Sequence, residues 1–242
     1  MNKLINIKSK KYSNNKKISD HLTEFGWVNL KKFIPKNTIK KIHQDFDNLS
    51  KKVCRLKFED AVLYLNKCDK DKLHRLSLDA AKTQNHMELI RLFNKKYSEI
   101  IKKKVLMVNF GQFIIPAPPS DKRLAYSYHQ ENNYYPYYNK TIHFHFALFK
   151  KATFKNGAMS ALSKSHKMKK ITDYEVIKQR KGVTSIIPKN INKFSKKYDE
   201  TVFELELGDL LIFDGNLIHK SNFNKTQKVR IVSIHRSAIF SK

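Results

Sequence analysis

The chain has 242 residues and carries 49 Lys and Arg against 21 Asp and Glu, a formal net charge of +28. Its length and its 40% of hydrophobic residues predict one globular domain over residues 1–242, with material for a sizeable core. The sequence has no apolar run long enough to span a membrane, no apolar N-terminal signal segment and only two cysteines, Cys54 and Cys68. Membrane-spanning and disulfide-framed secreted classes are therefore excluded, and we expect a cytoplasmic protein.

The chain begins with a basic segment and a short helix. Residues 1–17 are polar and basic, and we expect them to fray. A helix capped by Ser19 or Asp20 follows and ends at Gly26, because glycine readily adopts the left-handed conformation that closes a helix. The next four residues, Trp27-Val28-Asn29-Leu30, are typical of a strand.

Residues 18–103 as a whole are predicted to be mainly helical. The segment after Pro35 has apolar residues at the spacing of an amphipathic helix, namely Ile39, Ile42, Phe46 and Leu49. Residues 58–101 continue the helical pattern, and the periodicity is clearest from Leu89 to Ile101.

Residues 104–242 are predicted to form an antiparallel β core. Short β-rich runs alternate there with turn residues: VLMVNFGQFII, TIHFHFALF, VTSIIP, TVFELEL, DLLIF and RIVSIHRSAIF. This pattern is typical of a sandwich or barrel. The expected fold class is therefore α+β with a mainly β core, and the helices come first.

The first chemical motif in the β half is His129-Gln130-Glu131. On an extended segment residues i and i+2 point to the same side, so His129 and Glu131 can reach one metal ion while Gln130 points away. Such a tripeptide arises often by chance and is weak evidence when it stands alone.

Two later residues strengthen the motif. A turn at Gly208-Asp209 and a buried strand from Leu210 lead to His219, and Arg230 follows eleven residues later at the start of the last strong strand. Two imidazoles and one carboxylate form the facial triad of non-haem iron oxygenases, which leaves coordination positions open. A buried arginine can hold the far carboxylate of a chelating 2-oxo acid.

The chain resembles the phytanoyl-CoA dioxygenase family of Fe(II)/2-oxoglutarate oxygenases from about residue 20 onward. The resemblance rests on HLTEFGWVNLKKFIPKNTIKKI, SYHQENNYYP, HFALFKKATFKNGAMSALSKSHK and GDLLIFDGNLIHKSNFNKTQKVRIVSIHR. It implies a cupin-like double-stranded β-helix, or jelly roll, preceded and flanked by helices. It also implies hydroxylation of a small molecule, with oxidative decarboxylation of 2-oxoglutarate to succinate.

The resemblance implies roles for individual residues. His129, Glu131 and His219 are implied to hold Fe(II). Four residues are implied to contact 2-oxoglutarate: Arg230, Ser221, Gln112 and His145.

Two positions depart from the family pattern. The metal-binding carboxylate is usually Asp, whereas here it is Glu131, whose side chain is longer by one methylene. Family members that halogenate lack a carboxylate at this position, so Glu131 favours hydroxylation or a related oxidation. His145 replaces a Trp of the family and is expected to face the 2-oxoglutarate.

Two alternative functions remain open. Arg230 and Arg236 form an R-x5-R pattern similar to the closing strand of AlkB-type dioxygenases. In that alternative the net positive charge of the protein would bind the phosphate backbone of a nucleic acid. The eleven-residue gap between His219 and Arg230 counts against this alternative. The second alternative is a cupin-like barrel that binds a ligand without catalysis, which the intact triad disfavours.

The net charge itself is assigned mainly to composition. Only seven basic residues are Arg, and the lysines are scattered from Lys3 to Lys242 rather than clustered. Nucleic acid is therefore disfavoured as a partner, and the charge is expected at most to favour an anionic small-molecule substrate.

Overall fold

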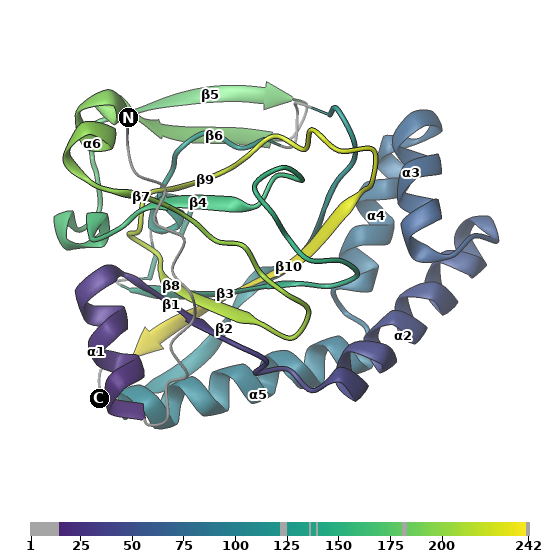
Figure 1. The fold of residues 1–242 in the computed structure, drawn as a ribbon, viewed down its shortest axis with the longest axis horizontal. Coiled ribbons are helices and arrows are strands. Elements are labelled where there is room, and N and C mark those ends of the chain that lie inside the picture. Colours follow the sequence, from purple (N-terminus) through teal and green to yellow (C-terminus); the bar gives the residue numbers. More distant parts are fainter. Residues whose placement is uncertain (1–14, 122–124, 136, 139, 181–182, 241–242) are drawn as a thin grey trace.

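The computed structural model describes residues 15–121, 125–135, 137–138, 140–180 and 183–240. Its first part comprises α1 (Asn15–Phe25), β1 (Trp27–Leu30), α2 (Lys36–Cys54), α3 (Phe58–Cys68), α4 (Lys70–Ala80) and α5 (Gln84–Ile101). The second part comprises β2 (Lys104–Ala117), η2 (Glu131–Asn133), β3 (Thr141–Ala147), β4 (Met159–Leu162), η3 (Ser165–Met168), β5 (Tyr174–Arg180), β6 (Val183–Pro188), α6 (Ile191–Lys197), β7 (Glu200–Val202), β8 (Leu210–Asp214), β9 (His219–Ser221) and β10 (Arg230–Phe240). The predicted order of helices before strands is confirmed (Figure 1).

The strands form a double-stranded β-helix. A five-stranded sheet has the order β1-β8-β3-β10-β2, and a three-stranded sheet has the order β7-β4-β9. All of these strand pairs are antiparallel, and β5 and β6 form a separate hairpin. In Figure 1, α2 and α5 run along one side of the larger sheet, while α3 and α4 stand at one end.

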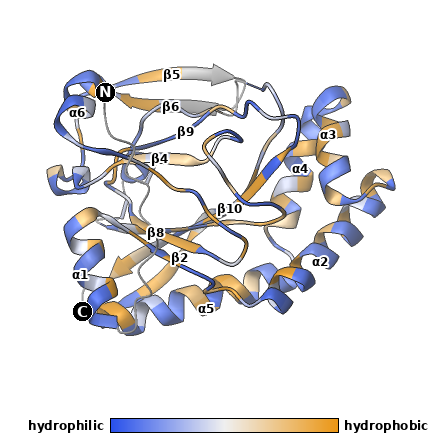
Figure 2. Cartoon of the chain, viewed as in Figure 1, coloured by the Kyte–Doolittle hydropathy of each residue, from blue (hydrophilic) through white to orange (hydrophobic). Residues whose placement is uncertain are grey.

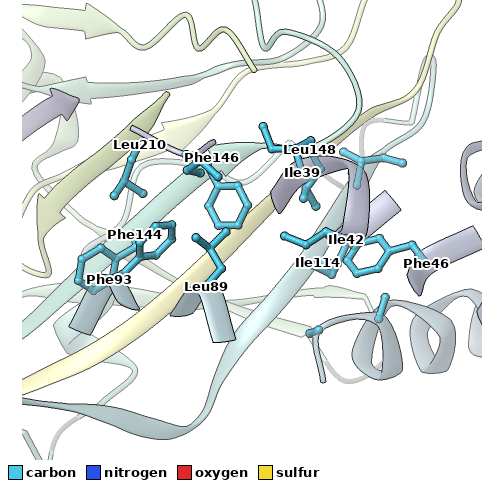
Figure 3. Packing of buried hydrophobic residues seen from close by; sticks show 14 of the residues in the cluster. Ile39, Ile42, Phe46, Leu89, Phe93, Ile114, Phe144, Phe146, Leu148 and Leu210 are labelled. Atoms are coloured by element: carbon cyan, nitrogen blue, oxygen red, sulfur yellow. The ribbon is translucent and has the colours of Figure 1, made fainter. Parts of the chain in front are cut away.

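The two faces of the larger sheet belong to two different cores. On β3, Ile142, Phe144 and Phe146 face the helices and pack with residues of α2 and α5, as Figure 3 shows for Phe144, Phe146, Ile42 and Phe93. On the opposite face, Ala147 of β3 and Phe213 of β8 pack with Met159 and Ala161 of the smaller sheet. The space between the two sheets is therefore where alternate residues of β3 and β10 point.

The helices are amphipathic. Ile39, Ile42 and Phe46 of α2 are buried, which confirms the predicted apolar face. In Figure 2 the helices carry both colours along their length, whereas β8, β2 and β10 are orange over much of theirs. None of the helices in the described part of the chain combines the length and apolar character that a membrane crossing requires.

Two predicted boundaries are wrong. The first helix already includes Asn15, upstream of the expected cap at Ser19 or Asp20, and the buried Ile18 extends its apolar face. The rest of the predicted frayed segment, residues 1–14, lies outside the described residues. The run TVFELEL is a strand only to Val202, and beyond it Leu205 makes a single bridge to Ala152.

A buried histidine connects the helices to the larger sheet. His86, at the start of α5, places Nδ1 2.9 Å from the Ala81 carbonyl oxygen and Nε2 2.7 Å from Ser233 Oγ on β10. Burial lowers the pKa of His86 to about 4 from its ordinary value of 6.5. The folded protein therefore holds this ring neutral at pH values where the unfolded chain would protonate it.

This shift predicts a pH-dependent stability. Because the folded pKa of His86 lies below the unfolded value, its contribution is full above pH 6.5 and declines as the pH falls toward 4. Urea unfolding of the wild type and of His86→Gln should show that the wild type loses about 2 kcal/mol more between pH 7 and pH 5. Equal losses in the two proteins would contradict the assignment.

Candidate active site

Two histidines 90 positions apart meet through a backbone bridge. The amide of His129 donates to the carbonyl of His219 at 2.9 Å, and the amide of His219 donates to the carbonyl of His129 at 3.0 Å. The amide of Ser221 also donates to the Tyr126 carbonyl at 3.0 Å. The segment before the first motif is thus attached alongside β9, and the two imidazole centroids come within 4.2 Å.

Both imidazoles are oriented in the same way. His129 Nδ1 lies 2.7 Å from the Ser127 carbonyl oxygen, and His219 Nδ1 lies 2.9 Å from the Leu217 carbonyl oxygen. A carbonyl oxygen only accepts, so in each ring Nδ1 carries a proton, and the neutral form of the ring then presents Nε2 with its lone pair. A metal-binding histidine is commonly held by a hydrogen bond of this kind.

Glu131 completes a set of three donors. Its Oε1 lies 3.7 Å from His129 Nε2 and 3.6 Å from His219 Nε2, and all three residues are buried. One ligand atom from each of them lies within 4.8 Å of the other two. Two neutral imidazole nitrogens and one carboxylate oxygen fit the donor set of non-haem iron, so these residues could hold the metal.

Gln130, the middle residue of the motif, points away from the donors. Its Nε2 donates to the carbonyls of Lys169 and Asn216, and its Oε1 accepts from the amide of Ile171. The expected opposite orientation is confirmed, and the buried amide ties the motif to two neighbouring loops.

A charged partner keeps Glu131 ionised. Arg236 donates from Nε to Oε2 at 2.8 Å and from Nη2 to Oε1 at 2.9 Å. Burial acts to raise the pKa of the Glu131 carboxyl, but the Arg236 guanidinium and the contacts with His129 and His219 together outweigh it and hold the pKa well below the usual range. For His219, burial lowers the pKa. This favours the neutral form of the ring, which can bind a metal.

A second arginine lies in the same wall of the pocket. Arg230, Val232, Ile234 and Arg236 alternate along β10 and line the pocket together. Arg230 is 2% exposed, and its Nε donates to the Asn156 carbonyl at 3.1 Å. Burial lowers the pKa of Arg230 to about 10, so it remains a cation at neutral pH.

Two other predicted cofactor contacts also reach the pocket. Ser221 lines it two residues after His219 on β9, so both side chains leave the strand on the same side. His145 lines it from β3, and burial, followed by the charge of Arg230, lowers its pKa to about 3. His145 is therefore a neutral hydrogen-bonding group beside a cation.

Gln112 does not line the pocket, so the structure does not bring it to the donor set as the resemblance implies. Its neighbours Phe113 and Ile115 pack on the core between the two sheets. Gln112 pairs with His235, and alternation along β2 places both side chains on the helix-facing side. The next residue, Phe113, lines the pocket instead.

Other histidine and tyrosine residues close to the motif in the sequence occupy two different places. His143 is fully buried, stacks on Phe213 and contacts Thr141 Oγ1 through Nε2 at 2.9 Å, and it lies outside the pocket lining. Tyr126, Tyr134 and Tyr135 do line the pocket.

The pocket has a volume of about 360 Å³, which suits a small molecule. Apolar walls come from Phe113, Ile115 and Met159. On α3 and α4 the lining includes four polar residues that the sequence did not single out: Asn66, Lys70, His74 and Ser77. Lys70 and His74 are exposed, whereas the three donors are buried, so the pocket leads from the donor set to an opening beside α4.

Comparisons with known proteins agree with this geometry. The family model for phytanoyl-CoA dioxygenase (PhyH) matches residues 22–232. No match is found among curated proteins.

Three solved structures share the fold. EvdO2 from Micromonospora carbonacea var. aurantiaca, complexed with 2-oxoglutarate, has a TM-score of 0.61 at 13% identity over 97% of this chain and 96% of that one. EctD from S. alaskensis, with 2-oxoglutarate and 5-hydroxyectoine, has a TM-score of 0.60 at 13% identity over 97% and 79%. The epimerase SnoN, in complex with Fe3+, alpha ketoglutarate and nogalamycin RO, has a TM-score of 0.62 at 10% identity over 93% and 83%.

The family match covers most of the chain, and the buried donor set fits the metal that the family uses. The cofactors are iron and 2-oxoglutarate. The chain belongs to the phytanoyl-CoA dioxygenase family of iron- and 2-oxoglutarate-dependent oxygenases.

Proposed function

We propose that this oxygenase hydroxylates a small-molecule metabolite. The reaction consumes O2 and 2-oxoglutarate and yields the hydroxylated substrate, succinate and carbon dioxide. The observation that supports the proposal most directly is the buried set of His129, Glu131 and His219 in one pocket with Arg230. When bound, iron and 2-oxoglutarate supply the activation of O2 that hydroxylation of a C–H bond requires.

In this proposal the chain contributes ligands, orientation and exclusion of water. His129 and His219 each present an Nε2 lone pair, and Glu131 presents one oxygen. Arg230 is a buried cation whose terminal amino groups make no hydrogen bond with other described residues. Those groups can clamp the distal carboxylate of 2-oxoglutarate, and the Ser221 hydroxyl assists.

The proposed roles predict different losses for two substitutions. His219→Ala removes a ligand and should abolish 2-oxoglutarate turnover. Arg230→Ala should chiefly raise the apparent KM for 2-oxoglutarate, by about 100-fold, because a buried charge pair loses one partner. Succinate formation and the visible charge-transfer band after anaerobic addition of Fe(II) and 2-oxoglutarate measure the two effects.

A matched control for His219→Ala is His235→Ala, which removes a buried histidine on the helix-facing side of β10 and should keep turnover. Normal turnover by His219→Ala would contradict the metal assignment. Absence of the charge-transfer band in the wild type would favour a protein that only binds ligands.

We further propose that the substrate is anionic. Of the described residues in the pocket lining, Lys70, Arg230 and Arg236 are cations and Glu131 is the one carboxylate. The two charges of iron(II) and the two of 2-oxoglutarate cancel, so positive charge remains in excess. Ser77 adds a buried hydroxyl that has no partner within the described structure.

This charge excess predicts that anionic metabolites stimulate succinate formation more than their neutral analogues do, and the pocket volume of about 360 Å³ favours a small molecule over single-stranded nucleic acid. For an anionic compound that is turned over, Lys70→Met should raise KM by up to about fivefold, as expected for one partly exposed ion pair. Lys67→Met, on α3 outside the pocket lining, is the matched control. Equal turnover of a compound and its neutral analogue would contradict the substrate class.

A further inference from the structure

The second arginine of β10 forms a two-point ion pair with the carboxylate of the donor set. Nε and Nη2 of Arg236 donate to different oxygens of Glu131, at 2.8 and 2.9 Å. The side chains are only 11% and 5% exposed. None of the roles proposed above for iron or 2-oxoglutarate binding involves this arginine.

The ion pair determines which carboxylate oxygen faces the histidines. Oε1 lies within 3.7 Å of both Nε2 atoms, while Oε2 receives the Nε–H of Arg236. A planar guanidinium that engages both oxygens holds the carboxylate in one plane. Glu131 therefore presents a single oxygen, Oε1, toward the two imidazoles.

This restraint matters more for a glutamate than for an aspartate. Glutamate has one more rotatable bond in its side chain, so more conformational freedom is lost when its carboxylate is fixed. Glu131 also starts a short 3-10 helix rather than continuing the extended segment of His129. A partner that grips the end of the side chain compensates for both features.

Arg236 is itself held in place. Its guanidinium carbon lies 5.1 Å from the centroid of the Phe113 ring and 5.7 Å from that of Tyr135. The β2–β10 register shifts between His235 and Ser237, on either side of Arg236, while the β10–β3 register runs through without a break. Bulges next to active sites commonly redirect a side chain.

The backbone of β2 also adapts to this residue. A Cβ added to Gly111 would lie 2.9 Å from the carbonyl oxygen of Arg236 and 3.2 Å from its Cβ. The strand therefore approaches Arg236 more closely than a larger residue at position 111 would allow.

We propose that Arg236 is a positioning residue that orients Glu131 as a one-oxygen iron ligand and so allows a glutamate to serve in this triad. The inference rests on the proposed role of His129, Glu131 and His219 as metal ligands. Arg236 acts through Glu131 and not on the metal.

The first test measures metal binding without 2-oxoglutarate. Anaerobic titration with Co(II), followed by its visible absorption, should show a dissociation constant about 10- to 100-fold higher for Arg236→Met than for the wild type, as for other groups that orient metal ligands. The absorption spectrum should also change, because the carboxylate loses its fixed plane. Thermal unfolding of the metal-free proteins checks that both are folded.

Two variants separate positioning from charge and from general loss of packing. Arg236→Lys keeps the charge but not the two-point geometry, and it should restore metal affinity only in part. His235→Ala removes a buried side chain next to Arg236 on the helix-facing side of β10, outside the pocket lining, and should leave Co(II) affinity within about twofold of the wild type. Full recovery by Arg236→Lys would overturn the proposal, because charge alone would then be sufficient.

A double-mutant cycle gives the sharpest test. The aspartate carboxylate of Glu131→Asp is withdrawn by one methylene from Arg236, so adding Arg236→Met to it should cost little further affinity. Losses that add independently would show that the two residues act separately and would overturn the proposal. Failure of the wild type to bind Co(II) would instead refute the proposed metal site, so the two failures are distinguishable.

Discussion

The whole site depends on one pair of backbone hydrogen bonds, between His129 and His219. The two residues belong to segments separated by most of the β core, and their reciprocal amide–carbonyl contacts place both rings on one side of the small sheet. Because these contacts involve only main-chain atoms, the imidazoles remain available for another task. The Nδ1 contacts with Ser127 and Leu217 then set the direction of each ring.

The last strand shows how one element serves two environments. On β10, Ser233 and His235 face the helices, and Ser233 contacts His86 there. Arg230 and Arg236, at even positions, face the space between the sheets. The period of two along a strand therefore separates a buried neutral network from a buried charged one, and a shift of one residue would exchange them.

Local periodicity and motif spacing are sufficient to predict much of the fold from the sequence. The apolar face of α2, the start of β10 at Arg230 and the grouping of His129, Glu131 and His219 all follow from residue spacing that the structure reproduces. The strands β4 and β9 were not predicted, because small and polar residues such as Ser160, Lys220 and Ser221 give none of the β-branched or aromatic signal of a strand.

Contacts between segments that are distant in the chain cannot be predicted from these sequence patterns. The resemblance implies a cofactor contact for Gln112, but a position along the chain does not reveal which face a bulged strand presents. In the sequence Arg236 stands out only as part of an R-x5-R pattern, and its pairing with Glu131 joins residues 105 positions apart. Lys70 of α4 lines the pocket because α4 packs against β2, which no pattern within the helix indicates.

The hydrogen bonds of the buried Gln130 amide do not involve the metal ligands. Three hydrogen bonds from this one side chain fasten the loop that carries the donors to the segment at Lys169–Ile171 and to Asn216. Hydrogen bonds within the polypeptide thus help to hold this loop, in contrast to small zinc domains, whose folding energy comes from the ion. Loss of the metal therefore removes none of these three contacts, because each joins Gln130 to backbone atoms of the chain.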